Sequence, residues 1–502
     1  MSKFADEIHV KVNVEPAVQG TVLRQHSHNG NFYHGKESEF TKFDNQFDAS
    51  VGTFHSIHDA NAFNRTNGNP TDSRHISEIK PKLTPRMQEF LAEISQKGGR
   101  AYYIGGVVRD HLEGKRNKDI DIEAHGLEFT VLESIAKNHG KVNTVGQSFG
   151  VTKLNFPQDG PEKEDEIDLS LPRRDNKTGE GHKGFQIEYD PHMGTQEASR
   201  RRDFTHGAML MDPLTGEVTD HYNGMQDMKD KVLRHVDDKS FDEDPLRMLR
   251  AMQIAARRGE TLHPSTAAKG PKLSQEYGTL SEDRVMSEWQ KMAEKGIEPS
   301  KGLQVLKDSG WDQHYPELQK SMTPDKMKTM DQMAKSFQNE NFSPEDKHAL
   351  FFAALTGNMS PQDSASFMNR VKMPTPIRKR VAALNRGLTS SYLTSNDPTD
   401  ANVKNISAQI GPDESMNHMM HVLRARNGGM LLSTHEEYHL RAKVLGVHQS
   451  PPKPLIDGEV LKSLGMQPGP EFGQTLREVY QRQLDGTITS REQAIQYVKS
   501  KS

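Results

Sequence analysis

The chain contains no cysteine among its 502 residues. It therefore cannot form a disulfide framework, a zinc–thiolate site or a thiol nucleophile. It also lacks an excess of positive charge, because 65 Lys and Arg stand against 69 Asp and Glu and the formal net charge is -4. Without a global basic field, any binding of nucleic acid must use local basic patches.

Long apolar runs are missing as well. The first residues, Met1 to Glu7, contain no apolar signal core, and no hydrophobic run approaches the length of a membrane-spanning helix. We therefore expect a cytoplasmic protein without a membrane partner. A chain of this length is expected to fold as several domains, and its oligomeric state is left open by the sequence.

The most informative segment that is present carries two aspartates, Asp119 and Asp121, shortly after a Gly105–Gly106 pair. The pattern predicts a strand, a tight glycine turn, a short helix and a second strand. Strand alternation places both carboxylates on one face, roughly 7 Å apart. Such a pair suits Mg²⁺, and two ions can clamp the attacking and leaving oxygens of an in-line displacement. The glycines let backbone N–H groups approach a polyphosphate.

Two further polar segments follow. Glu166–Leu171 alternates polar and apolar residues, which predicts a strand with Asp168 as a third carboxylate on its polar face. An edge strand with one wet side is the plainer alternative. Next comes the arginine run Arg200–Arg202, directly followed by Asp203. A run of this kind is usually a solvated charge cluster, but the Asp-Phe-Thr after it favours a site.

In order and spacing, these motifs resemble those of the DNA polymerase β-like nucleotidyltransferases. With the runs Asp220–Asp227, Leu233–Val236 and Glu243–Ala251, they are similar to the class II CCA-adding tRNA nucleotidyltransferases and bacterial poly(A) polymerases. The similarity is dense over residues 86–320 and fainter beyond. It implies an α+β fold, in which a polymerase β-like head with a small mixed sheet is followed by an elongated all-helical neck, body and tail.

The expected organisation has four parts. Residues 1–85 form a polar N-terminal extension, loosely ordered or packed as loops, in which we predict no regular helix or strand. The catalytic head spans 86–224, the helical neck that selects the nucleotide spans 225–300, and the helical body and tail that bind RNA span 301–502. Within the head, the stretch from Pro172 to about Glu197 is expected to be a flexible loop beside the site.

The resemblance implies a template-independent enzyme that adds CMP and AMP to the 3′ end of tRNA, with ATP and CTP as substrates and two Mg²⁺ ions as cofactors. Asp119 and Asp121 would hold the metal, and Asp168 would complete the catalytic carboxylates. The residues expected to bind the triphosphate and ribose are Gly105, Gly106, Arg109, Arg202 and Asp203. For Arg109, an ordinary surface ion pair with Asp110 is the alternative.

The helix that begins near Asp244 is expected to choose the base. Asp244 suits the cap of this helix, and Arg247 and Arg250 are spaced to share one of its faces. A carboxylate accepts from the exocyclic amino group of cytosine or adenine, and a guanidinium donates to the adjacent ring nitrogen. In the resembled family these positions select C and A without a nucleic-acid template.

The chain departs from the resembled family at one position of the head. Gly207 stands where the family has an asparagine, and it follows His206 in place of an aliphatic residue. The departure removes a hydrogen-bonding side chain near the sugar. Two alternatives to CCA addition therefore remain open. One is a bacterial-type poly(A) polymerase, and the other is a nucleotidyltransferase-derived domain of a phage or mobile element with a mainly RNA-binding or structural role.

Overall fold

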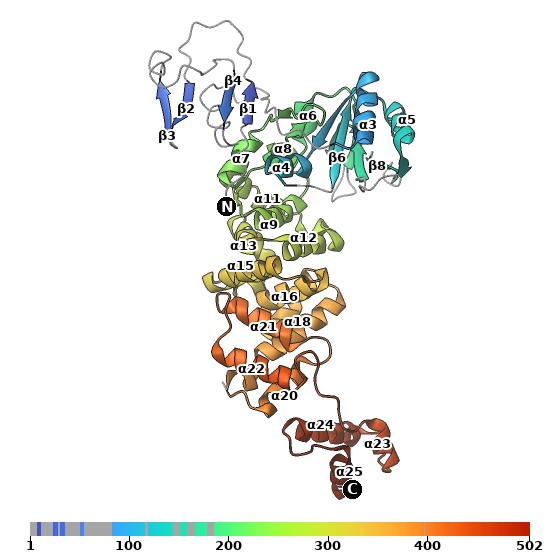
Figure 1. Ribbon diagram of the computed structural model, residues 1–502, viewed down its shortest axis with the longest axis vertical. Coiled ribbons are helices and arrows are strands. Elements are labelled where there is room, and N and C mark those ends of the chain that lie inside the picture. Colours follow the sequence, from blue (N-terminus) through green and yellow to red (C-terminus); the bar gives the residue numbers. More distant parts are fainter. Residues whose placement is uncertain are drawn as a thin grey trace. The chain divides into compact units, whose positions relative to one another are not determined.

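The computed structural model describes residues 83–115, 119–143, 151–157, 166–177, 185–395 and 397–501, with backbone only at 175–177 and 185–186, and the backbone of short strands nearer the N-terminus. Packing divides the chain into two units. The first comprises Met1–Arg247 and Thr261–Thr279, and the second comprises Met248–Glu260 and Leu280–Ser502 (Figure 1). The domain boundaries expected from the family motifs stay predictions.

The first unit is built on a mixed sheet that has seven strands within the described residues, in the order β13-β12-β5-β6-β9-β8-β7. The central pair, β6 and β9, is parallel. Strand β9 lies between β6 and β8, so the edge-strand alternative for the Asp168 segment is wrong. The strands are β5 (Arg100–Ile104), β6 (Ile120–His125), β7 (Lys141–Asn143), β8 (Val151–Asn155), β9 (Glu166–Ser170), β12 (Leu210–Met211) and β13 (Val218–Thr219).

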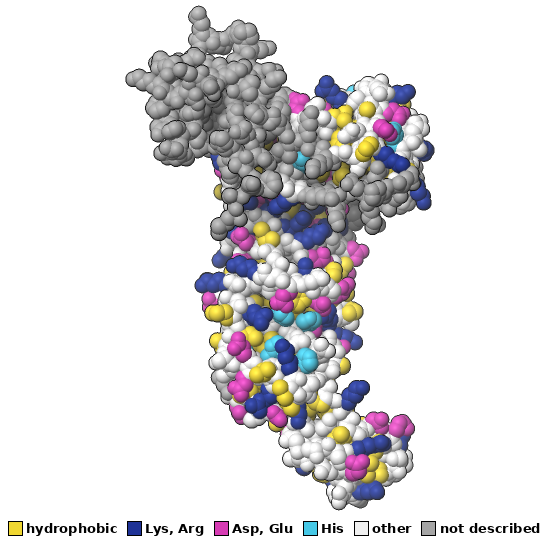
Figure 2. All heavy atoms as spheres, viewed as in Figure 1, with side chains coloured by type: hydrophobic (Ala, Val, Ile, Leu, Met, Phe, Trp, Pro, Cys, Tyr) yellow, Lys and Arg dark blue, Asp and Glu magenta, His cyan; other side chains and the backbone are white. Residues whose placement is uncertain are grey.

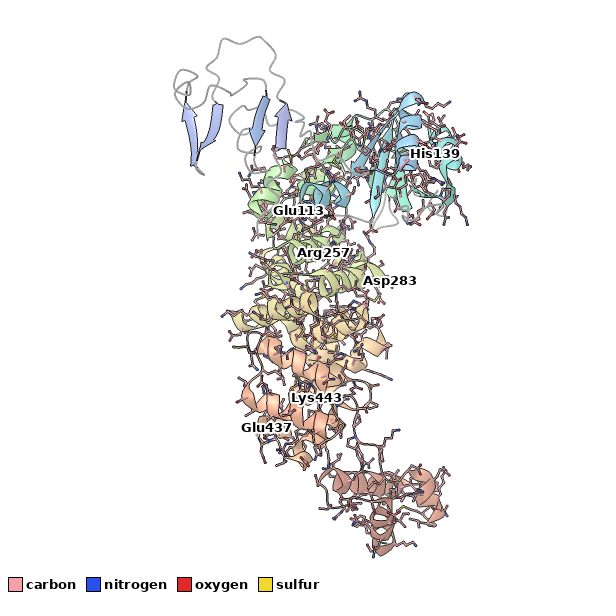
Figure 3. The ribbon with its side chains drawn as sticks, viewed as in Figure 1. Glu113, His139, Arg257, Asp283, Glu437 and Lys443 are labelled. Atoms are coloured by element: carbon pink, nitrogen blue, oxygen red, sulfur yellow. The ribbon has the colours of Figure 1, made fainter. Side chains whose placement is uncertain are left out.

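Alternation along the central strands separates a core face from a polar face. Ile122 and Leu169 lie in the hydrophobic core, with the buried residues of helices α3 (Pro85–Gln96) and α5 (Phe129–His139). Thr84 caps α3 by accepting from the backbone N–H of Met87, and Pro85 is the first helical residue, as predicted. His139, labelled in Figure 3, joins the two helices through a 2.7 Å contact with Glu93.

The segment from Pro172 to Glu197 corrects one expectation. Its described parts form an antiparallel hairpin of β10 (Arg173–Lys177) and β11 (Phe185–Tyr189), followed by helix α6 (Thr195–Arg200). The prediction of a loop is therefore wrong for these residues. The two strands pair with each other outside the seven-stranded sheet. Strand β10 is polar throughout and gives no strand signal, whereas β11 alternates Phe185, Ile187 and Tyr189 with polar residues, a signal that the loop prediction overlooked. Residues 178–184 lie outside the described residues.

The N-terminal extension contains regular structure that we did not predict. Within its described backbone, β1 (Ile8–Lys11) pairs with β4 (Val51–Phe54), and β2 (Arg24–His28) pairs with β3 (Asn31–Gly35), both antiparallel. Strands of this length fill too short a window for a periodic signal. The other residues of the extension, and the prediction made for them, lie outside the described residues.

Short elements complete the first unit after the sheet. A parallel pair, β14 and β15, interrupts the helical pattern that we expected from residue 225 onward. The elements are η2 (Thr205–Gly207), α7 (Gly224–Asp230), β14 (Val232–Leu233), α8 (Asp238–Phe241), β15 (Thr261–Leu262), α10 (Pro264–Ala267), α11 (Gly270–Ser274) and η3 (Tyr277–Thr279).

The second unit is helical throughout its described residues and includes most of α9 (Leu246–Arg258), which begins in the first unit. Trp289 is fully buried, donates from Nε1 to the Tyr315 hydroxyl at 3.2 Å, and packs edge-on against Phe367. The remaining elements are α12 (Glu282–Lys295), α13 (Pro299–Asp308), η4 (Trp311–His314), α14 (Pro316–Gln319), α15 (Pro324–Asn339), α16 (Pro344–Thr356), α17 (Pro361–Arg370), α18 (Thr375–Leu388), α19 (Ser391–Thr394), α20 (Asp400–Ile410), α21 (Met416–Arg426), α22 (Ser433–Val444), α23 (Gly458–Ser463), α24 (Pro470–Leu484) and α25 (Arg491–Lys501).

The last three helices enclose a smaller apolar core of their own around Leu461, Val479 and Val498. On the face of the second unit seen in Figure 2, basic and acidic side chains are interspersed. Among the described residues no helix is both long and apolar enough to cross a membrane. A mixed-sheet unit followed by helices confirms the predicted α+β class.

Gly224 offers a test of how α7 packs against the η2 turn. A Cβ at Gly224 would lie 2.4 Å from the Thr205 carbonyl oxygen and 2.9 Å from the Cα of His206, both backbone atoms. We expect Gly224→Ala to lower the free energy of unfolding by roughly 1–3 kcal/mol, because the backbone must shift. Gly278→Ala is the control, since nothing lies within 4 Å of its Cβ position. Equal transition temperatures of the two variants in calorimetry would contradict this packing.

Candidate active site

Three carboxylates meet on the polar face of the sheet. The parallel register of β6 and β9 sets Asp121 directly opposite Asp168. Asp119 is exposed and immediately precedes β6, two residues from Asp121. Burial raises the pKa of Asp121; the charge of Arg202 opposes this rise, and Asp168 and Asp119 add to it. The structure therefore brings the three predicted carboxylates together and makes them repel one another.

Their chemistry fits a hard divalent cation. Carboxylate oxygens are the ligands that Mg²⁺ prefers, and a cation between them would relieve their repulsion. In the described part of the chain, no group of three or more His, Cys, Asp or Glu side chains is arranged so that it could hold a metal ion. Lys153 on β8 is the register partner of Asp168, with its Nζ 3.1 Å from the Asp168 carboxylate, and it also pairs with Glu166. Sequence reasoning missed Lys153, because only strand pairing places it there.

The predicted glycine turn lies against this group. Gly105 precedes helix α4 (Gly106–Leu112) with φ 70° and ψ -127°, a conformation that L side chains rarely adopt. A Cβ at Gly105 would lie 4.0 Å from Asp121 Oδ2. The backbone at this turn is therefore close enough to the carboxylates for one ligand to contact both.

Arg109, on α4, makes two contacts. Its Nη1 lies 3.3 Å from Nδ1 of the buried His206, and its Nε lies 3.8 Å from the Asp110 carboxylate. The ion pair that we considered as the alternative for Arg109 is therefore present. The contact with His206 also ties α4 to the η2 turn, so Arg109 links two segments of the predicted site.

Glu123 is a central residue of the site that sequence reasoning missed. It lies two residues beyond Asp121, is 1% exposed, and its Oε2 accepts from Arg201 at 3.0 Å and from Arg202 at 3.1 Å. His125 lies 3.3 Å from its Oε1, and the other ring nitrogen of His125 lies 3.0 Å from the Met193 carbonyl oxygen. The alternation of β6 predicted the face of Glu123, but nothing local predicted its partners.

The charges around Glu123 decide its ionisation. Burial alone would raise its pKa, but the hydrogen bond from His125 and the charges of Arg202 and Arg201 outweigh burial and lower the pKa to about 2. Glu123 is therefore a carboxylate at neutral pH. It holds both arginines beside the strand that carries Asp121.

The segment that follows these arginines is fixed by backbone pairing. Phe204 forms an antiparallel bridge with His235, and the N–H of Thr205 donates to the Arg234 carbonyl at 2.9 Å. Asp203 Oδ1 accepts from its neighbouring N–H at 2.9 Å. A Cβ at Gly207 would meet Asp203 Oδ1 at 3.6 Å, an ordinary contact. Packing therefore leaves room for a side chain at Gly207.

Two buried aspartates in this region have structural roles. Asp227 accepts from the Thr205 hydroxyl at 2.7 Å and from Arg234 Nε at 3.1 Å. Asp220 accepts from the N–H groups of Gly224 and Met225 at 2.9 and 3.0 Å, which anchors the start of α7. Because Arg234 and Thr205 both bind Asp227, the run Leu233–Val236 is connected to the segment that contains Asp203.

Two of the three predicted base-selecting residues, Asp244 and Arg247, contact backbone groups. Asp244 Oδ1 accepts from the Leu246 N–H at 3.0 Å, so its capping role is confirmed. Arg247 Nη2 donates to the Arg201 carbonyl oxygen at 2.7 Å, and the guanidinium lies 5.8 Å from the centre of the Phe241 ring. Arg250 lies one turn further along α9, in the second unit.

The sequence of this chain is similar to those of known tRNA-processing proteins. Residues 101–234 match a family described as the poly A polymerase head domain. A multifunctional CCA protein of Xanthomonas campestris is 34% identical over 216 residues, which cover 42% of this chain and 49% of that protein. A CCA-adding enzyme of Lactobacillus johnsonii is 26% identical over 83% of this chain and 96% of its own length.

Solved structures agree in fold. A Bacillus stearothermophilus CCA-adding enzyme in complex with CTP has a TM-score of 0.58 at 20% identity, covering 84% of this chain and 98% of its own. A Thermotoga maritima CCA-adding enzyme complexed with tRNA has a TM-score of 0.54 at 18% identity, covering 84% and 96%. The chain is thus similar to bacterial CCA-adding enzymes over most of its length and to the poly A polymerase head domain over residues 101–234.

The chain spans about half the length of the curated multifunctional CCA proteins that it matches at 34–36% identity. The match to the family's head domain contains the carboxylates and the glycine turn. At Gly207, where we expected the family asparagine, the structure leaves room for a Cβ. The departure from the family is therefore not forced by packing.

Glu123 predicts how the stability of the metal-free protein depends on pH. Its pKa is lowered on folding, so its carboxylate stabilises the fold above about pH 4.5, and this contribution is lost as the pH falls toward 2. The shift is worth on the order of 3 kcal/mol. Hydrogen exchange of the β6 amides should therefore show wild type and Glu123→Gln becoming more alike as the pH falls. A difference in opening free energy that does not change with pH would contradict this ionisation.

Proposed function

We propose that the protein is a template-independent RNA nucleotidyltransferase that adds CMP and AMP to the 3′ end of tRNA. The observation that carries the proposal is the register that sets Asp121 opposite Asp168, beside the Gly105 turn. Phosphoryl transfer requires carboxylates that hold a metal ion. It also requires backbone groups that approach the polyphosphate closely. The similarity to CCA-adding enzymes, one of them solved with CTP and one with tRNA, supports the choice of substrates.

The reaction is an in-line displacement at phosphorus. The RNA 3′-hydroxyl oxygen forms a bond to the α-phosphate of the incoming nucleotide, the bond between the α-phosphate and its bridging oxygen breaks, and pyrophosphate leaves while the hydroxyl proton is lost to solvent. Asp119 and Asp121, with Asp168, would hold two Mg²⁺ ions. When bound, these ions supply activation of the hydroxyl and neutralisation of the leaving group.

The chain's own groups would hold the triphosphate beside these carboxylates. The Gly105 turn lies beside Asp121, and Gly106 and Arg109 belong to the short helix that follows it. Arg202 is held near Asp121 by Glu123, so little side-chain freedom is lost when it meets a phosphate. Asp203, one residue further, would contact the ribose.

Base selection would fall to Asp244, Arg247 and Arg250. An Asp–Arg pair matches the donor and acceptor pattern of cytosine and adenine and opposes that of uracil and guanine. The hydrogen bond from Arg247 to the Arg201 carbonyl orients this guanidinium before any nucleotide binds. The role of Arg250 is carried over from the family pattern.

Incorporation assays test the whole proposal. Transfer RNA that lacks its 3′ CCA is incubated with the protein, Mg²⁺ and each labelled nucleotide in turn. We expect CMP to be added first and AMP only after two CMP residues. Long tails of AMP alone would assign a poly(A) polymerase, a possibility that the head-domain match also supports. No incorporation, combined with RNA binding, would leave an RNA-binding or structural role.

Asp121→Asn tests the metal site. We expect nucleotide addition to fall by about 10²–10³-fold or more, because a transition-state contact is removed. The melting temperature should not fall, because one of three mutually repelling carboxylates has lost its charge. Asp230→Asn makes the same chemical change at the end of α7 and should leave addition unchanged. Near-normal turnover of Asp121→Asn would rule out the catalytic assignment.

Arg247→Ala tests base selection. A good bidentate base contact is worth roughly 1–3 kcal/mol, so the preference for CTP over UTP should fall by about one to two orders of magnitude. Asp244→Ala is a poorer probe, because loss of the cap alone costs about 1 kcal/mol of stability. The quantity to compare is the ratio of kcat/KM for the two nucleotides. A ratio that does not change in folded Arg247→Ala would remove this helix from base selection.

A further inference from the structure

We propose that Arg201 is a positioning residue for nucleotide selection, which joins the catalytic strand β6 to the base-selecting Arg247. Its side chain binds Glu123 on that strand, and its backbone carbonyl binds the Arg247 guanidinium. The inference rests on the proposed function, since it explains how a nucleotide chosen by Arg247 would be aligned with the carboxylates. Neither motif reasoning nor the family resemblance assigned a role to Arg201.

The contact with the strand is buried and charged. Arg201 Nη2 lies 3.0 Å from Glu123 Oε2; the Arg201 side chain is 17% exposed and that of Glu123 is 1% exposed. Arg202 reaches the same oxygen at 3.1 Å. Charge-assisted hydrogen bonds at such low exposure are stronger than neutral ones and have little competition from water. The Glu123 carboxylate therefore clamps two successive residues of the segment to the strand that carries Asp121.

The other contact reaches the base-selecting residue. Arg247 Nη2 donates to the Arg201 carbonyl oxygen at 2.7 Å. The Arg247 guanidinium also faces the Phe241 ring, and Phe241 packs edge-on against Phe204 at 5.7 Å between ring centres. These two contacts of Arg247 are thus with groups that the segment clamped by Glu123 helps to fix; Arg247 Nη1 also lies 3.5 Å from the Ser240 hydroxyl. If the clamp is lost, the carbonyl that orients Arg247 is free to move.

Small displacements matter for this kind of selection. A hydrogen bond to a base edge tolerates little error in position, and a shift of about 1 Å far from the reacting atoms can reduce turnover by about 10²-fold. The Arg201 side chain would act through Arg247 and touch neither the base nor the phosphate. Its loss should therefore change the choice among nucleotides, whereas loss of an ordinary structural ion pair would change only the amount of folded protein.

The chain offers a matched control in the preceding residue. Arg200 is 50% exposed and pairs with Asp237 at 3.0 Å and with Glu197 at 3.7 Å, and both acids are at least partly exposed. Arg200→Met and Arg201→Met remove the same guanidinium from neighbouring positions. Methionine retains much of the apolar stem of arginine. A difference in nucleotide preference between the two variants therefore measures the effect of losing the Arg201–Glu123 contact.

The experiment measures kcat and KM for CTP and UTP in the full-length protein and its two variants, with melting temperatures beside them. In Arg201→Met we expect the ratio of kcat/KM for CTP to that for UTP to fall by about tenfold, at the lower end of the loss of one base contact. In Arg200→Met it should stay within about twofold. A folded Arg201→Met with an unchanged ratio would overturn the proposal, whatever its melting temperature.

Glu123→Gln breaks the clamp from the other side while keeping the shape of the side chain. It should lower the same ratio, and the double variant with Arg201→Met should show no larger fall than Glu123→Gln alone, because Glu123→Gln already weakens the Arg201 contact together with those to Arg202 and His125. Additive falls in the double variant would mean that the two residues act separately, and would overturn the proposal. If Arg201→Met does not fold, Glu123→Gln carries the test alone.

Equilibrium binding of CTP and UTP without tRNA separates this inference from the proposed function. If wild type adds no nucleotide to tRNA but prefers CTP in binding, and Arg201→Met loses that preference while Arg200→Met keeps it, the proposed function fails and the positioning role stands. If wild type is active and Arg201→Met keeps the full preference in both assays, the positioning role fails and the function stands. A wild-type protein without preference in either assay overturns the positioning role.

Discussion

The buried carboxylate of Glu123 is the interaction on which the rest of the site depends. It lies on the strand that carries Asp121, and its oxygens bind His125 and both Arg201 and Arg202. A carboxylate at this depth is tolerated only because these partners offset the cost of burial. The same contacts bring a charged, otherwise solvated arginine run onto the polar face of the sheet. One carboxylate thus fixes the start of the segment that we propose to bind the nucleotide.

The polar face as a whole shows the same balance. Asp119, Asp121 and Asp168 repel one another, and the cations nearest to them are Arg202 and Lys153. The core face of the same strands is apolar and buried, so the sheet cannot turn the carboxylates away without exposing its core. A cluster of like charges is therefore held in place by hydrophobic packing on the opposite side. This arrangement would suit the divalent cation that we propose for the site.

The contacts beyond the sheet give the segment after Arg202 its shape. Its backbone bridges to His235, its Thr205 hydroxyl bonds to Asp227, and α7 packs on it through Gly224. Motifs that look chemical in the sequence, such as the Asp220–Asp227 run, thus have structural roles. By contrast, Arg201 and Arg202 both bind Glu123, which lies far from them in the chain and next but one to Asp121. The role of a polar residue in this region therefore depends on which residues it contacts in the folded chain.

The sequence by itself determined what local periodicity and capping control. Strand alternation placed Asp121 and Ile122 on opposite faces, Pro85 marked the start of a helix, and Gly105 marked the turn before α4. The family resemblance added the mixed-sheet fold and the candidate residues. Each of these follows from interactions within a few residues, or from motifs that are short and ordered.

Only the tertiary structure decided which distant residues meet. The register of β6 with β9 sets Asp121 opposite Asp168, and the pairing of β8 brings Lys153 beside them. The hairpin of β10 and β11 and the N-terminal strands were not predicted, because each strand is short and is fixed by hydrogen bonds to a partner strand. The partners of Glu123 come from residues about eighty positions away. Strand pairing and buried charge are long-range interactions, and no local pattern in the chain encodes them.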